Sequence, residues 1–289
     1  MPKTTRKTAA KTKRIDGTSA PHPKKKTAKS KAAKTEPKAV KIDQPNWITE
    51  ENLKDYVQDV INSVVKTFHK HGHVVTDEPV LVYQQDKENL YPIALSDAAP
   101  GGERVIKLAT FGPYRGQIAY QFAHEYCHTF TKHWINTLTH KNMWFAEMLC
   151  ELASLWCISQ MAKDWEAGDA PREDWVAFGP KLQDYVDRHV KDVHVFGGVG
   201  EFAAWLKPTM WSLRKHSALR DLNTTIALHL LPLFKREPGI WEATAFMNVG
   251  QREDTEFDAH LQQWYDSAPK KLKHYVAMVA AEMGVELKK

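Results

Sequence analysis

Three ionisable side chains stand together in residues 116–131, a stretch that is otherwise apolar or neutral apart from tyrosine and cysteine. His124, Glu125 and His128 form the pattern His-Glu-x-x-His. In a helix, a spacing of four residues turns the side chain by about 400°, so both imidazoles project from one face about 6 Å apart. Two such imidazoles can share one metal ion, and Glu125 can act on a metal-activated water. The spacing predicts a metal centre with a general base.

The next predicted helix, residues 142–162, carries two carboxylates in an otherwise apolar sequence. Apolar residues occupy nearly every face of this helix, which is the pattern of a buried helix. Burial of an isolated carboxylate is costly, so Glu147 and Glu151 need a metal, a cation or hydrogen-bond donors. We expect Glu147 to be the third metal ligand and Glu151 to accept the ring N–H of a ligand histidine. Lysine or arginine side chains from elsewhere in the fold are the alternative partners.

The pattern His-Glu-x-x-His, followed by 18 residues and then Glu147, resembles that of the gluzincin metallopeptidases. This family includes thermolysin and the zinc aminopeptidases, and the resemblance covers about residues 105–160. It implies a zincin-like fold with zinc held by His124, His128 and Glu147, catalysis by Glu125, and support from Glu151. Hydrolysis of a polypeptide substrate, with Glu125 as general base for a metal-activated water, is the implied activity.

The resemblance leaves endopeptidase and aminopeptidase activity open. Ala146 stands where many members have asparagine, and the glycine-rich motif by which aminopeptidases bind a free N-terminus is missing. Two further functions remain as alternatives. One is a non-catalytic zincin-fold protein associated with nucleic acid, and the other is a zinc amidohydrolase with a non-protein substrate. Glu125 favours an enzyme, because a purely structural metal site needs no base.

The family also implies a second group that stabilises the oxyanion, supplied by a downstream tyrosine or histidine. Tyr185, His194 and His216 are the candidates, and the sequence does not choose among them. The strand predicted at residues 105–110 lies just before the active-site helix. We expect it either to be the edge strand that pairs with an extended substrate or to be a plain core strand.

The first 44 residues carry most of the positive charge. They hold 12 lysines and 2 arginines against 3 acidic residues, a net charge of +11. Because the whole chain has a net charge of +5, residues 45–289 have a net charge of −6. Because this segment has few apolar residues to bury, we expect residues 1–45 to be a disordered basic tail. Such a tail can bind nucleic acid or another polyanion, or it can serve only as a solubilising leader.

Residues 46–289 are expected to form one metallopeptidase domain of the α+β class, predominantly α-helical. A helix that begins near Thr49 and ends at Gly72 precedes three short β-rich runs, which predict a small antiparallel sheet before the active-site helix. Helical patterns follow, with breaks near Pro208 and at Pro269. The strands are expected at residues 80–83, 91–95 and 105–110, the catalytic core at about 80–163, and a helical C-terminal part at 174–289.

The cysteines and the hydropathy bear on the compartment. Cys127, Cys150 and Cys157 are odd in number and lack the spacing of a disulfide framework, which fits a reducing environment, and Cys127 is expected in the core. No window of about 18 apolar residues predicts a membrane span, and no apolar core of a signal peptide is found in the first 30 residues. We therefore expect a cytoplasmic protein without membrane contact.

Overall fold

A computed structural model describes residues 38, 40–42, 53–76, 78–132, 141–252 and 254–288. They belong to one compact unit, Thr35–Lys289. The predicted disordered tail lies outside the described residues, except for Lys38 and for Val40–Ile42, which form strand β1. The tail prediction is wrong for these three strand residues, because Val40 packs against the core and its carbonyl accepts a hydrogen bond from Gln58 (3.2 Å).

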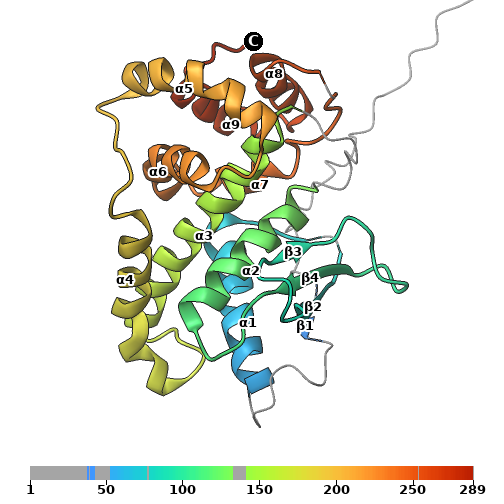
Figure 1. Cartoon of the computed structure of the whole chain (residues 1–289), viewed down its shortest axis with the longest axis vertical. Coiled ribbons are helices and arrows are strands. Elements are labelled where there is room, and N and C mark those ends of the chain that lie inside the picture. Colours follow the sequence, from blue (N-terminus) through green and yellow to red (C-terminus); the bar gives the residue numbers. More distant parts are fainter. Residues whose placement is uncertain are drawn as a thin grey trace, which may run out of the picture. The chain divides into compact units, whose positions relative to one another are not determined.

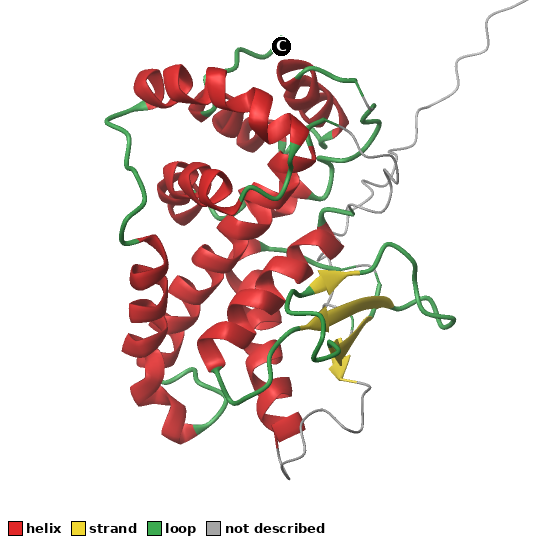
Figure 2. Cartoon of the chain, viewed as in Figure 1, coloured by secondary structure: helices red, strands yellow, loops and turns green. Residues whose placement is uncertain are grey.

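The described strands form a mixed four-stranded sheet in the order β1-β2-β4-β3 (Figure 2). β1 and β4 run parallel to β2, and only β3 and β4 are antiparallel. A small sheet before the active-site helix is confirmed, but the antiparallel prediction is wrong for two of the three pairings. Parallel strands need a crossover connection, which a helix supplies between β1 and β2 and residues 85–103 supply between β2 and β4. The remaining bounds are β2 Val80–Gln84, β3 Ile93–Ala94 and β4 Arg104–Leu108.

Strand order also decides which strand lies at the edge of the sheet. β4 lies between β2 and β3, so of the two alternatives for residues 105–110 the core strand is confirmed and the edge strand is wrong. The short β3 occupies that edge instead. One face of the sheet is buried through Val80, Val82, Ile106 and Leu108, each 1% exposed or less.

Helices make up most of the described chain (Figure 1), as the predicted α+β class with predominant helix requires. α1, Leu53–Gly72, contacts β1, and α2, Arg115–Phe130, contacts β3 and β4. The other helices are α3 Met143–Glu166, the 3-10 helix Glu173–Phe178, α4 Gly179–Val190, α5 Val199–Lys215, α6 Arg220–Arg236, α7 Ile240–Thr244, α8 Phe257–Ser267 and α9 Lys273–Glu282.

One of the two predicted helix breaks is confirmed. Pro269 lies between α8 and α9, where the chain turns. The break near Pro208 is wrong, because Pro208 is an exposed residue inside α5 and the helix ends only at Lys215. Proline removes one helical hydrogen bond, and at an exposed position water can satisfy the carbonyl that loses its partner.

α3 is buried on nearly every side, as its apolar sequence predicts. It packs against α1, α2, α4 and α6, and aromatic rings fill the contacts on one side. The ring of Trp156 lies 5.3 Å from that of Phe68 on α1 and 5.4 Å from that of Trp241 on α7. Among the helices described, none is both long enough and apolar enough to cross a bilayer.

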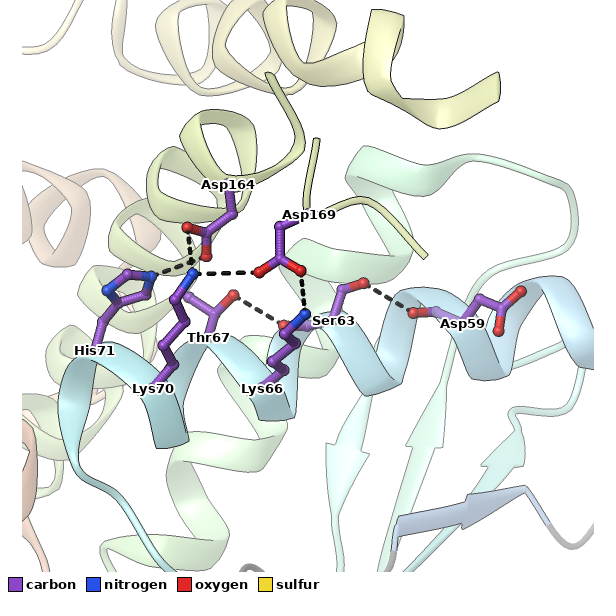
Figure 3. Close-up of polar contacts among 8 residues, drawn as sticks. All are labelled: Asp59, Ser63, Lys66, Thr67, Lys70, His71, Asp164 and Asp169. Carbon is purple, nitrogen blue, oxygen red and sulfur yellow. Dashed lines mark hydrogen bonds and ion pairs between the residues drawn. The ribbon is translucent and has the colours of Figure 1, made fainter. Parts of the chain in front are cut away.

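The C-terminal end of α3 is also joined to α1 by charged side chains, which we call the α1 ion-pair network (Figure 3). Lys70 Nζ lies 3.0 Å from Asp164 and 3.2 Å from Asp169, and His71 Nε2 lies 2.8 Å from Asp164. Lys66 pairs with Asp169 as well. These side chains are partly exposed, with 44% of the Lys70 side chain accessible.

Candidate metal centre

The predicted metal ligands come together where α2 packs against α3. His124 Nε2 lies 3.4 Å from Glu147 Oε2, and His128 Nε2 lies 3.6 Å from Glu147 Oε1. The two imidazole centroids are 5.3 Å apart. Tetrahedral zinc with bonds of about 2.0–2.2 Å holds neighbouring nitrogen and oxygen donors about 3.4 Å apart. The separations of the two imidazole nitrogens from the Glu147 oxygens are close to this value, and the donor types are ones that zinc accepts.

Cys150 is a further donor at this place that the sequence analysis did not single out. One ligand atom from each of His124, His128 and Cys150 lies within 4.8 Å of the others. Burial raises the pKa of the Cys150 thiol well above its usual value, helped by a hydrogen bond with Cys127. Glu147, the third donor that the sequence predicts, approaches both imidazoles with its carboxylate oxygens, so both Glu147 and Cys150 are available as a third donor. A sequence signal exists, since Cys150 follows Glu147 by one helical turn.

Two contacts hold α2 in place. Arg115, in its first turn, lies over the rings of Tyr56, Trp175 and Phe178 at 4.9, 4.4 and 4.5 Å, which anchors the start of the helix. Ser154 on α3 donates a hydrogen bond of 2.8 Å to the carbonyl of residue 120 on α2. The facing positions of the histidines and Glu147 depend on this packing.

Glu125 is buried beside the imidazoles and is only 4% exposed. Burial raises the pKa of its carboxyl to about 7, and the charge of Glu147 adds to this, against the opposing effects of His124 and a backbone hydrogen bond from Ala94. A carboxyl that titrates near neutral pH can both accept and release a proton there, as a general base must.

His124 shows the opposite balance. Burial lowers the pKa of its imidazole, but the hydrogen bond to Glu147 and the charges of Glu125, Glu147 and Glu151 outweigh burial and raise the pKa to about 9. Without a metal, the carboxylates around His124 therefore favour a protonated ring. A metal cation at the same place would replace that proton.

Glu151 has partners other than those predicted. Its Oε1 accepts hydrogen bonds from Tyr120 (2.5 Å) and Thr224 (3.1 Å), and it lies 3.3 Å from His189 Nε2. Burial opposes ionisation, yet the bonds from His189 and Tyr120 lower the pKa of this carboxyl. Among the described residues, the partners of Glu151 are Tyr120, Thr224 and His189, from α2, α6 and α4, and none of them is a predicted metal ligand. The prediction that Glu151 orients a ligand histidine is therefore wrong.

His124, Glu125, His128 and Glu147 open onto a cleft with a volume of about 610 Å³. This volume is within the usual range for ligand sites. Of the three oxyanion candidates, only Tyr185 lines it. His194 is exposed and lies 3.5 Å from Glu201, and neither it nor His216 reaches the cleft. The cleft is lined by Leu90–Ala94, Gln117, Tyr120, Gln121, His124, Glu125, His128, Met143, Glu147, Glu151, Tyr185, His189, Ala218, Arg220 and Asn223.

Tyr185 reaches the cleft by packing closely against α2. Its ring lies against Gly116 in the first turn of α2, where a Cβ atom would stand 2.9 Å from the Tyr185 Cδ2. One turn along α4, His189 approaches the Tyr120 hydroxyl to 2.8 Å.

Sequence reasoning missed Tyr120, His189 and Arg220 as lining residues. Helical spacing offered a signal for two of them, because Tyr120 precedes His124 by one turn and His189 follows Tyr185 by one turn. Arg220 is placed by the packing of α6, for which the sequence gives no sign.

Comparisons with known proteins returned no match: no family model, no curated protein and no solved structure is similar enough to this chain to be reported. The interpretation of the site therefore depends on its geometry and chemistry.

Proposed function

We propose that this protein is a zinc-dependent peptidase of the gluzincin kind. The observation that carries the proposal is the arrangement of His124, His128 and Glu147 at separations suited to one zinc ion, with Glu125 buried beside them in a cleft. A zinc ion bound there would supply Lewis-acid activation of a water and of a carbonyl oxygen.

The side chains of this chain provide the proton transfers. Glu125, with a pKa of about 7, takes the proton of the attacking water and delivers it to the leaving amine. Tyr185 is the candidate donor to the oxyanion, because it lines the cleft while His194 and His216 do not.

The substrate would bind along β3. This strand is the edge of the described sheet, and it passes beside Glu125, so an extended peptide can add to it through backbone hydrogen bonds. Leu90 and Tyr91, just before β3, are 78% and 60% exposed. These apolar side chains at the mouth of the cleft favour a polypeptide over a small polar substrate.

A peptide library tests this function. The zinc-loaded protein should cleave members of the library, chelation should stop cleavage, and added zinc should restore it, with products identified by mass spectrometry. Absence of cleavage by fully zinc-loaded protein would refute the peptidase assignment. Hydrolysis of non-peptide amides alone would identify a zinc amidohydrolase instead.

A further inference from the structure

Arg220 is a cation in the cleft that no described residue pairs with. It is exposed, it begins α6, and within the described part of the chain it makes no hydrogen bond or ion pair. Of the eight arginines in the described residues, four have a carboxylate partner. Examples are Arg104 with Glu78, Arg172 with Asp59, and Arg214 with Glu256.

The acidic residues of the cleft do not use Arg220 because other groups neutralise them. Glu151 is held by hydroxyl groups and by His189, and Glu147 lies between two imidazoles. Glu125 receives the backbone hydrogen bond from β3. Burial and the charge of Glu151 raise the pKa of Tyr185, and the positive charge of Arg220 partly opposes them, so this charge acts on the wall of the cleft. The guanidinium is therefore left for a ligand.

We propose that Arg220 binds a carboxylate of the substrate in the cleft, and that the site thereby selects peptides that carry a carboxylate within its reach. The guanidinium is planar and pairs with a carboxylate through two parallel hydrogen bonds, which gives direction as well as affinity. The inference rests on the proposed peptidase function and specifies its substrate. A free C-terminus and an aspartate or glutamate side chain are the two sources of this group.

The test compares three peptides of matched length: one with a free C-terminus, the same peptide amidated, and the amidated peptide with one internal glutamate. Binding is measured by calorimetry with the zinc-loaded Glu125→Gln variant, and cleavage is measured with wild type. A peptide with a carboxylate should bind and react about tenfold to a hundredfold better than the amidated peptide. Preference for the peptide with a free C-terminus would identify the C-terminal carboxylate as the ligand of Arg220. Preference for the amidated peptide with glutamate would identify a side-chain carboxylate.

Arg188→Gln is the matched control for Arg220→Gln. Arg188 is also exposed, and its charge also acts on Tyr185, but it does not line the cleft. The Arg220→Gln variant should lose the preference for a carboxylate, Arg220→Lys should keep part of it, and Arg188→Gln should keep all of it.

The outcomes separate this inference from the peptidase assignment. Equal affinity for the amidated peptide and both carboxylate peptides, a preference that survives Arg220→Gln, or no binding of any peptide would overturn the inference. Binding that depends on Arg220 but is never followed by cleavage supports the carboxylate site and refutes the peptidase. Cleavage of all three peptides at equal rates supports the peptidase and refutes the carboxylate site.

Discussion

Two polar clusters join α3 to neighbouring helices, and both combine histidine with carboxylates. In the candidate metal centre, where α2 meets the N-terminal half of α3, Glu125 and Glu151 are 4% and 3% exposed. In the α1 ion-pair network, at the other end, Asp169 keeps 39% of its side chain accessible. Burial raises the pKa of Glu125 to about 7, and the carboxylates around His124 raise the pKa of that imidazole to about 9. In the network, ion pairing only lowers the pKa of Asp169 and raises that of Lys70.

The difference shows what burial adds to the same residue types. The exposed pairs favour the ionised forms that water also favours, and screening by solvent leaves them little energy. The buried groups lack water, so each protonation state depends on its neighbours, and some groups titrate near neutral pH. If burial causes this difference, substitutions in the two clusters should have effects of very different size.

Replacement of the buried base should have the largest effect. Glu125→Gln removes the proton acceptor but keeps the shape, so peptide cleavage should fall by about a hundredfold to ten-thousandfold while zinc content is unchanged. Rates are followed by mass spectrometry and zinc by atomic absorption. The exposed Glu286→Gln is the control and should act as wild type; a Glu125→Gln enzyme of full activity would remove Glu125 from the mechanism.

Loss of the third donor should weaken zinc binding strongly. Glu147→Ala leaves two imidazoles, and we expect the affinity for zinc to fall by at least about a hundredfold, more than the loss typical of an outer-shell change. Competition with a chromophoric chelator measures it. Cys150→Ser should bind zinc as wild type does, whereas a loss confined to Cys150→Ser would make the cysteine the ligand.

Glu151→Ala should destabilise the fold by about 3 kcal/mol, because Tyr120, Thr224 and His189 would lose a buried acceptor. Urea unfolding of the metal-free protein measures this loss. The pKa of Glu151 is lowered in the folded state, so its contribution is present above about pH 4.5 and is lost as the pH falls through the folded pKa. A loss that does not shrink in acid would contradict the assignment of an ionised Glu151.

Zinc affinity should depend on pH through His124. Its pKa of about 9 means that zinc must displace a proton at lower pH, so affinity should rise about tenfold for each unit as the pH rises toward 9 and level off above it. Titrations with competing chelator at several pH values measure the slope. Affinity that is constant from pH 7 to 9 would show that the free protein holds His124 neutral.

The α1 ion-pair network should give the smallest effect. Asp169→Asn removes the ion pairs with Lys66 and Lys70, and we expect unfolding free energy to fall by less than about 1 kcal/mol, and less still at high salt. Urea unfolding at two salt concentrations measures it. A loss as large as that of Glu151→Ala would erase the distinction between the two clusters.

Local patterns in the sequence were enough for some features. The spacing of His124, His128 and Glu147 along two helices anticipated their meeting, because helical periodicity fixes which face each side chain occupies. The apolar sequence of α3 likewise anticipated its burial.

Features set by distant packing were not anticipated. The order of the sheet placed β3 rather than residues 105–110 at the edge, and strand order depends on crossovers that local patterns do not encode. The partners of Glu151 come from three helices, so only tertiary structure brings them to it.

The Tyr185 ring can lie against α2 only because Gly116 has no side chain. Tyr185 lies so close to α2 that even an alanine at position 116 would act as a wedge between the two helices. Since His189 follows Tyr185 by one turn on the same helix, α4, a shift of the Tyr185 ring would change the wall of the cleft beside His189. The position of the Tyr185 ring in the cleft thus depends on glycine at position 116.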